Sequence, residues 1–175
     1  MPAHYILIGA SAASIGALHK LRQVDPEASV SIFSAEKELP YNKCLLADFL
    51  AGIHEQDRLA IYRPAGQAHV YLNTAIVSID PADKTITTQA GIIHAYDHLL
   101  LGMGSGPWIP PITGVENQGV FTFHTLADTL AIKEYRSKNQ VKNAVIIGAG
   151  LSGLEAADAL AQQGIAVTVV EKTDR

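Results

Sequence analysis

Two glycine-rich turns in this sequence follow apolar runs, each at a point where a strand would pass into a helix. The second turn is Gly148-Ala149-Gly150-Leu151-Ser152-Gly153, directly after Val145-Ile146-Ile147. In such a turn the first glycine permits the tight bend, the second lets a pyrophosphate approach the backbone, and the third lets helix and strand pack closely. The amides at the helix N-terminus then favour bound phosphate. This pattern predicts a dinucleotide site on Gly148, Gly150, Leu151, Ser152 and Gly153.

An acidic residue in the expected position strengthens this prediction. Glu171 ends the next predicted strand, 23 residues after Gly148. A carboxylate there accepts hydrogen bonds from ribose hydroxyls and repels a 2′-phosphate, which favours NADH among the NAD(P)H cofactors. Lys172 and Arg175 lie close enough in sequence to accommodate a 2′-phosphate instead. The competing interpretation of the motif is a glycine-rich turn that binds nothing.

The first turn departs from the same pattern. It reads Gly9-Ala10-Ser11-Ala12-Ala13-Ser14, with serine at the second and third glycine positions. Ser11 can donate its N–H and its hydroxyl to a phosphate, whereas Ser14 loosens the contact between helix and strand. Glu36 follows 27 residues after Gly9, displaced beyond the strand end by Ser34-Ala35. Taken alone this turn is ambiguous, but two such turns 139 residues apart predict two dinucleotides on one polypeptide.

The elements that must position these turns follow from the apolar pattern. Strands are expected at 4–9, 30–33, 97–101, 144–148 and 166–171, and helices at 12–24, 45–53, 125–138 and 153–163. Between them, 70–72, 75–79, 85–88 and 92–94 are short and partly alternating, which predicts an antiparallel meander. Strand–helix–strand order makes the strands that flank each helix parallel. Four glycines and three prolines in 104–119 predict a domain boundary there.

Composition excludes several classes of protein. Hydrophobic residues make up 48% of the 175 residues and charged residues 17%, which argues against disorder. The formal net charge of −4 disfavours a nucleic-acid partner. The single cysteine, Cys44, excludes an internal disulfide, and the seven histidines lack zinc-like spacing, so no metal site is predicted. The apolar run 5–18 has no basic residue before it and is too short to span a membrane, so a cytoplasmic protein is expected.

Together these motifs resemble the FAD-dependent pyridine nucleotide-disulfide oxidoreductase superfamily. The likeness is greatest to its rubredoxin–NAD reductase, ferredoxin reductase and nitrite reductase FAD-subunit branch. Beyond the paired turns, three stretches carry it: Ala35-Glu36-Lys37-Glu38-Leu39-Pro40-Tyr41-Asn42-Lys43, Tyr96-Asp97-His98-Leu99-Leu100-Leu101-Gly102-Met103-Gly104-Ser105 and Gly153-Leu154-Glu155-Ala156-Ala157. Gly102 and Met103 stand where the family has Ala-Thr, and Trp108 stands where many members have a basic residue.

The resemblance implies two cofactors, FAD and NADH, and a set of residues for each. For FAD the implied residues are Gly9, Ala10, Ser11, Ala13, Ser14, Ala35, Glu36, Lys43 near the isoalloxazine, the backbone at Val77, and Met103-Gly104. NADH would lie on Gly148, Gly150, Leu151, Ser152, Gly153 and Glu171, with Glu155 beside the nicotinamide. The implied reaction is hydride transfer from nicotinamide to flavin, followed by electron delivery to a redox protein or a small acceptor.

Cys44 leaves a second activity open. It falls where NADH oxidases, peroxidases and coenzyme A-disulfide reductases of this superfamily place a redox cysteine. A thiolate there, beside Lys43, could attack a disulfide or a peroxide. The alternative is a small apolar residue that opens a helix, because electron-transferring relatives often carry proline at this position.

The expected fold is α/β. A doubly wound, Rossmann-like FAD domain with an antiparallel meander spans 1–112, and the first strand–helix–strand of an NAD(P)H-binding domain spans 113–175. Superfamily members continue beyond this point, so the chain is expected to be a fragment or truncated relative whose fold a second chain could complete. A non-catalytic FAD-binding module is therefore a third functional hypothesis.

Overall fold

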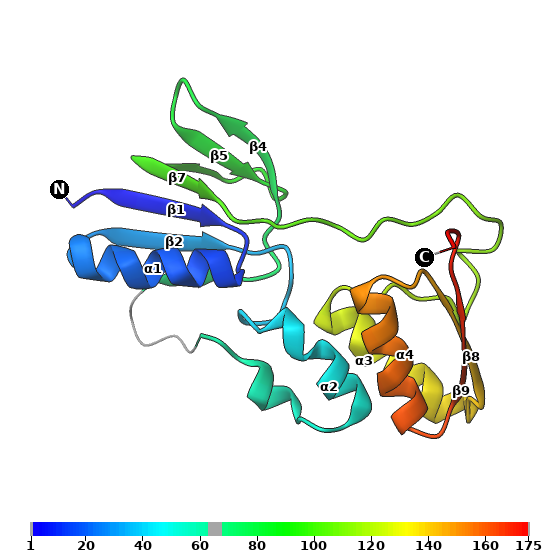
Figure 1. Ribbon diagram of the computed structural model, residues 1–175. Helices are drawn as coiled ribbons and strands as arrows, with labels where there is room; N and C mark the ends of the chain where they lie inside the picture. Colours follow the sequence, from blue (N-terminus) through cyan, green and yellow to red (C-terminus); the bar gives the residue numbers. More distant parts are fainter. Residues whose placement is uncertain (1, 63–67, 175) are drawn as a thin grey trace. The chain divides into compact units, whose positions relative to one another are not determined.

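The computed structural model describes residues 2–62 and 68–174, which form two compact units (Figure 1). Unit 1 comprises Met1–Tyr41 and Ala60–Ser105, and unit 2 comprises Asn42–Leu59 and Gly106–Arg175. The break at residues 105 and 106 falls inside the glycine- and proline-rich stretch. Residues 42–59, however, belong with the second unit, which the linear domain prediction did not anticipate.

Unit 1 is built on a four-stranded parallel sheet with strand order β3-β2-β1-β7. The strands are β1 (His4–Ile8), β2 (Ser29–Phe33), β3 (His69–Tyr71) and β7 (His98–Leu101). Helix α1 (Ala12–Val24) connects β1 to the parallel strand β2. It begins at the N-cap Ser11, whose Oγ accepts the N–H of Ser14, and it ends at Asp25, immediately before Pro26.

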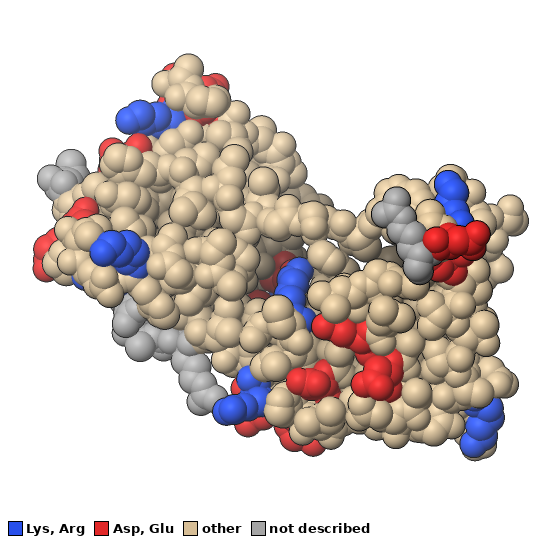
Figure 2. Space-filling model, viewed as in Figure 1, with Lys and Arg blue, Asp and Glu red and all other residues tan. Residues whose placement is uncertain are grey.

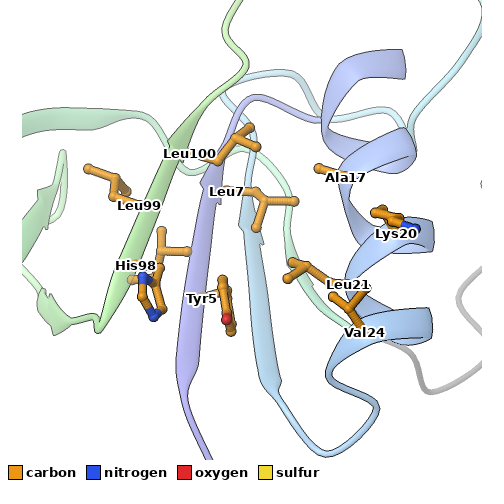
Figure 3. A pocket seen from close by; sticks show the side chains of 10 residues that line it. Tyr5, Leu7, Ala17, Lys20, Leu21, Val24, His98, Leu99 and Leu100 are labelled. Atoms are coloured by element: carbon orange, nitrogen blue, oxygen red, sulfur yellow. The ribbon is translucent and has the colours of Figure 1, made fainter.

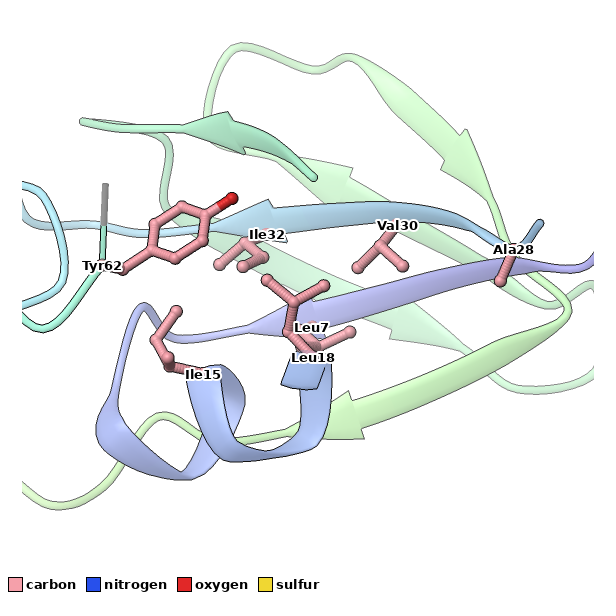
Figure 4. Close-up of a cluster of buried hydrophobic side chains, with 7 residues drawn as sticks. All are labelled: Leu7, Ile15, Leu18, Ala28, Val30, Ile32 and Tyr62. Carbon is pink, nitrogen blue, oxygen red and sulfur yellow. The ribbon is translucent and has the colours of Figure 1, made fainter. Parts of the chain in front are cut away.

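Alternating side chains of β1 and β2 supply two separate cores. Leu7, Val30 and Ile32 face α1 and pack with Ile15, Leu18, Ala28 and Tyr62 (Figure 4). On the opposite face, Ile6, Ile8 and Phe33 pack with Ile86 of the meander. Because both faces are covered, β1 reads as an almost continuous apolar run, and in β2 the stretch from Val30 to Phe33 is interrupted only by Ser31.

The meander consists of three antiparallel strands, β4 (Ile76–Asp80), β5 (Thr85–Thr88) and β6 (Ile93–Ala95). The prediction that 70–72 is part of this meander was wrong, because β3 pairs in parallel with β2. The backbone N–H of Ser34 donates to the carbonyl of Tyr71 at 2.9 Å, which continues that parallel pairing. A three-residue strand carries too little periodicity to distinguish these two environments.

Unit 2 contains a second strand–helix–strand. Strand β8 (Asn143–Ile147), helix α4 (Leu151–Gln162) and the parallel strand β9 (Ala166–Val170) follow one another along the chain. Helix α3 (Leu126–Asn139) begins at Thr125, and the predicted capping box with Asp128 is confirmed. Helix α4 begins two residues before the predicted start at Gly153, so Leu151 and Ser152 lie in its first turn.

A short helical segment from the first third of the sequence completes the core of unit 2. A 3-10 turn at Lys43–Leu45 leads into α2 (Leu46–Ala51), and a second 3-10 turn follows at Gln56–Leu59. Leu50 and Ala51 are buried with Ala159, Leu160 and Ile165. The helix predicted over 45–53 is observed as the shorter α2. Its predicted end near Gly52 is confirmed, since Gly52 is the C-cap residue in the left-handed conformation.

None of the helices in the described part of the chain has the length and apolar character needed to cross a membrane. The α/β fold class, with parallel sheets and helical crossovers, is confirmed.

Candidate functional site: two dinucleotide-binding turns

The turn between β8 and α4 has the backbone that its three glycines predict. Gly148 has φ +102°, which favours glycine, and Gly150 is the extended N-cap residue of α4. A Cβ at Gly153 would collide with the carbonyl oxygen of Gly148, so this glycine is required for the close packing of helix on strand. A Cβ at Gly150 would meet no atom within 4 Å. The same holds for Gly148, so both glycines lie on an open side of the turn, which is where the sequence predicts a phosphate.

The N-terminus of α4 has no side-chain cap among the described residues. This distinguishes it from α1, capped by Ser11, and from α3, capped by Thr125. The exposed Leu151 and Ser152 lie in its first turn, where backbone N–H groups have no acceptor within the helix. A helix end of this kind favours an anionic ligand.

Glu171 lies beside this turn, as its spacing predicts, and also holds the turn in place. Its Oε2 accepts the N–H of Ala149 at 2.7 Å, and its Oε1 accepts the N–H groups of Lys172 at 2.7 Å and Thr173 at 3.1 Å. These backbone donors, that of Ala149 first, lower the pKa of Glu171 below its ordinary value. The side chain therefore stays an exposed anion at neutral pH beside the predicted ribose site.

The turn between β1 and α1 follows the same backbone course despite its serines. Gly9 has φ +99°, and a Cβ there would collide with the carbonyl of Gly102. Ser11 is half-buried and caps α1, with its Oγ 3.3 Å from the backbone nitrogen of Ser14. Ala13 is exposed in the first turn of the helix, whereas Ser14 is fully buried.

Beyond the end of β2, the structure places Glu36 next to a partner that the sequence analysis did not assign. The hydroxyl of Tyr41 donates to Glu36 Oε2 at 2.6 Å. The backbone N–H of Glu36 donates to Ser34 Oγ at 3.1 Å, so the two residues that displace Glu36 from the strand also form its turn. The spacing Glu-x-x-x-x-Tyr was the available signal, and Ala35, directly before Glu36, is exposed.

Val77 lies in a β-bulge between β4 and β5. The pairing passes from Ile76 opposite Thr88 to Ser78 opposite Thr87, so Val77 has no partner in the ladder. A bulge leaves the backbone groups of its extra residue outside the ladder, and bulges are common beside binding sites. The Val77 side chain is 63% exposed, and the use of its backbone by FAD stays a prediction.

At the end of β7, Met103 is 60% exposed and Gly104 has φ +69°. The backbone N–H of Gly102 donates to the carbonyl of Ile8 at 2.7 Å, and the Cα of Met103 lies close to Gly9. The β7 end and the first glycine turn are therefore in direct contact within unit 1.

The three predicted catalytic residues, Lys43, Cys44 and Glu155, all belong to unit 2. Cys44 and Glu155 line one pocket of about 260 Å³ between α2 and α4. The remaining lining residues are Ala47, Asp48, Ala51, Ile53, Asp158, Ala159 and Gln162. Figure 2 shows acidic side chains gathered on this face, in agreement with the three carboxylates among the lining residues.

Cys44 is exposed, and its position is set by a residue that the sequence analysis did not assign. Asn42 is the N-cap of the 3-10 turn, and its Oδ1 accepts the N–H of Cys44 at 3.0 Å. Lys43 and Cys44 are thus the first residues of a capped turn, with both side chains at the surface. An asparagine immediately before a helical segment is the signal that identifies this cap.

A second cavity, of about 340 Å³, lies in unit 1 between β1, β7 and α1 (Figure 3). Tyr5 and His98 stack across the two strands with ring centroids 4.6 Å apart, and Leu7, Leu99 and Leu100 supply much of the wall. None of the residues predicted to bind a cofactor lines it, so the predicted chemistry lies elsewhere.

Comparison with known proteins agrees with these features. Residues 3–175 match the family described as pyridine nucleotide-disulphide oxidoreductase. An NAD(P)H coenzyme A polysulfide/persulfide reductase of Pyrococcus horikoshii is 32% identical over 97% of this chain and 40% of its own length. The structure of an NAD-dependent persulfide reductase from A. fulgidus matches with a TM-score of 0.92 and 32% identity, over 98% of this chain and 34% of that one. A ferredoxin reductase from Rhodopseudomonas palustris matches with a TM-score of 0.87 and 28% identity, over 99% of this chain and 43% of that one.

The chain therefore belongs to the pyridine nucleotide-disulphide oxidoreductase family, as its paired turns and flanking motifs predict. It spans about 40% of the length of the Pyrococcus relative.

Proposed function

We propose that the chain is part of an FAD-dependent NAD(P)H oxidoreductase in which unit 1 binds FAD and unit 2 binds NADH. The observation that carries the proposal is the pair of strand–turn–helix sites with matching backbone geometry, each with a carboxylate beyond its second strand. One dinucleotide site alone would suit a simple dehydrogenase. Two on one chain suit transfer between a nicotinamide and a second dinucleotide cofactor.

The residues in and around the first glycine turn of unit 1 fit FAD. Gly9 supplies the bend, the N-terminus of α1 faces the pyrophosphate, and Glu36 is the acceptor for ribose hydroxyls, with Tyr41 orienting its carboxylate. The bulged backbone at Val77 offers polar groups to the adenine. When bound, FAD supplies the redox chemistry, accepting hydride from NADH and passing electrons on.

Unit 2 supplies the electron donor in this proposal. The uncapped α4 N-terminus and the open face at Gly150 bind the pyrophosphate of NADH. Glu171 binds the ribose hydroxyls and repels the 2′-phosphate of NADPH, which gives the preference for NADH. Glu155, one turn into α4, orients the nicotinamide.

The test is the visible spectrum of the purified chain before and after anaerobic addition of NADH. A flavin band that NADH bleaches is the expected result. A flavin band that NADH leaves unchanged would contradict hydride transfer by this chain and favour an FAD-binding module. No flavin band, even after incubation with added FAD, would contradict FAD binding itself.

A second candidate activity concerns the electron acceptor. Cys44 is exposed at a pocket that it shares with Glu155, so a substrate can reach its thiol, and reduction of a persulfide, disulfide or peroxide by Cys44 is the alternative to delivery to a redox protein. Under this candidate, Cys44→Ser abolishes NADH-dependent persulfide reduction and leaves flavin bleaching by NADH unchanged. Equal persulfide reduction by the variant and the parent would show that Cys44 does not carry this activity.

A further inference from the structure

The two glycine-rich turns share one backbone course although only one of them has the glycine pattern. The N–H of Gly9 donates to the carbonyl of Phe33 at 2.8 Å, and that of Gly148 donates to the carbonyl of Val170 at 2.8 Å. Each helix then begins with an equivalent bond, Ile15 to Ser11 and Leu154 to Gly150, both at 3.0 Å. The serines of the first turn have therefore not changed its path.

The two turns keep the same backbone path although the residue at their third glycine position differs. In unit 2 a Cβ at Gly153 would collide with the carbonyl of Gly148, so the backbone leaves no space for a side chain. In unit 1 the same position holds Ser14, which is fully buried. Unit 1 therefore packs a buried serine at the helix–strand position that glycine or alanine ordinarily fills.

The Ser14 hydroxyl occupies space beside Gly102, at the end of β7. A Cβ at Gly102 would collide with Ser14 Oγ, and it would lie 3.2 Å from Ser11 Oγ and 3.4 Å from Leu100 Cδ2. The φ of Gly102 is not in the left-handed region, so its backbone could accommodate alanine. The neighbouring hydroxyls, and not the backbone, are what exclude a side chain at this position.

We propose that Gly102 is a positioning residue of the unit 1 nucleotide turn, and that it and Ser14 form one coupled pair. Gly102 leaves free the space that Ser14 Oγ occupies, so a side chain at residue 102 would displace Ser14 and the helix N-terminus that carries it. This inference deepens the proposed function, because it explains how a serine-substituted turn keeps an FAD-competent geometry. It also accounts for glycine at a position where the resemblance leads one to expect alanine.

The orphaned hydroxyl of Ser14 makes the pair testable. Among the described residues, Ser14 Oγ has no hydrogen-bond partner although it is buried. Removing an unsatisfied buried hydroxyl is neutral or stabilising. Ser14→Ala thus deletes the atom that would clash with a side chain at residue 102, with little cost of its own.

The experiment is a double-mutant cycle on the whole chain, followed by thermal unfolding without FAD. Gly102→Ala lowers the midpoint by roughly 5 °C or more in the Ser14 background, as expected for overpacking. The same substitution lowers it by less than about half as much in the Ser14→Ala background. Gly16→Ala is the matched control, because a Cβ there meets no atom within 4 Å and its effect is the same in both backgrounds.

A second readout separates positioning from stability alone. In folded protein, well below each midpoint, Gly102→Ala weakens FAD binding by roughly tenfold, and Ser14→Ala in the same chain restores it to within about threefold of the parent. Equal unfolding midpoints for Gly102→Ala and the parent would overturn the coupling. Equal losses of midpoint in the Ser14 and Ser14→Ala backgrounds would overturn it as well. If the parent binds no FAD, the proposed function fails, and the unfolding cycle alone decides whether Gly102 and Ser14 are coupled.

Discussion

At the scale of single residues, Glu171 has two roles, of which the sequence indicated only one. Its spacing from Gly148 predicted a ribose acceptor, and the structure adds that its carboxylate holds the amide of Ala149 in the glycine turn. Under the proposed function, the residue that shapes the turn also carries the charge that determines the cofactor preference.

We expect Glu171→Arg to reverse the preference between NADH and NADPH. The substitution removes the repulsion of a 2′-phosphate and adds a bidentate partner for it. The ratio of kcat/KM for NADPH to that for NADH should rise by roughly 100-fold, measured as flavin reduction by each cofactor. Glu171→Gln, which removes only the charge, should give a smaller rise. An unchanged ratio in both variants would place the 2′-phosphate away from residue 171.

The lowered pKa of Glu171 gives a prediction about acid. Because backbone donors favour its ionised form, the stabilisation it provides is present above the ordinary carboxyl pKa and is lost as pH falls through the lowered value. The amide chemical shift of Ala149 should therefore titrate below the usual glutamate range. In Glu171→Gln that acid step should be missing, and its persistence would assign the titration to another group.

At the scale of elements, α3 shows how strongly a local signal can fix a helix start. Thr125 Oγ1 accepts the N–H of Asp128 at 3.1 Å, and Asp128 Oδ2 accepts the N–H of Thr125 at 3.0 Å. Each side chain satisfies an amide that the helix itself cannot, so four adjacent residues determine the boundary.

Thr125→Ala should lower the free energy of unfolding of unit 2 by about 1 kcal/mol, because the amide of Asp128 loses its acceptor. Urea unfolding monitored by circular dichroism measures this loss. Ser137→Ala, at an exposed position of the same helix, is the control and should be neutral or slightly stabilising. An equal effect of the two substitutions would mean that the cap contributes nothing.

At the scale of the whole molecule, the division into two units does not follow the order of the chain. Residues 42–59 lie between two segments of unit 1 in sequence, yet Leu50 packs with Ala159 and Leu160 of α4. Lys133 of α3 adds a hydrogen bond of 2.7 Å to the carbonyl of Phe49, and its Nζ lies 4.3 Å from the centroid of that ring. Unit 2 therefore depends on α2 for its core.

A fragment of residues 113–175, cut at the boundary that the sequence predicted, should consequently not unfold cooperatively by itself. Without α2, the apolar faces of α3 and α4 are left in water. Thermal unfolding and dye binding to exposed apolar surface would report this, with the 175-residue chain as the control. A cooperative transition in the fragment would show that α2 is dispensable.

In the whole chain, Leu50→Ala should lower the free energy of unfolding of unit 2 by about 2–5 kcal/mol, since Leu50 is fully buried.

The sequence by itself determined the elements whose signals are local and strong. The glycine turns, the capping box at Thr125, the α1 boundaries at Ala12 and Val24, and the acidic residue at 171 all follow from spacing within a few turns or strands. Backbone sterics and hydrogen-bond satisfaction act over that same range, so the information needed is present in adjacent residues.

Tertiary structure decided whatever depends on contacts between distant segments. The parallel pairing of β3 with β2, the membership of α2 in unit 2, and the shared pocket of Cys44 and Glu155 bring together residues far apart in the chain. The same is true of Gly102, whose lack of a side chain has meaning only beside Ser14, 88 residues earlier. Side-chain packing is close to crystal density, so the residue allowed at one position is set by its spatial neighbours, which spacing along the sequence does not reveal.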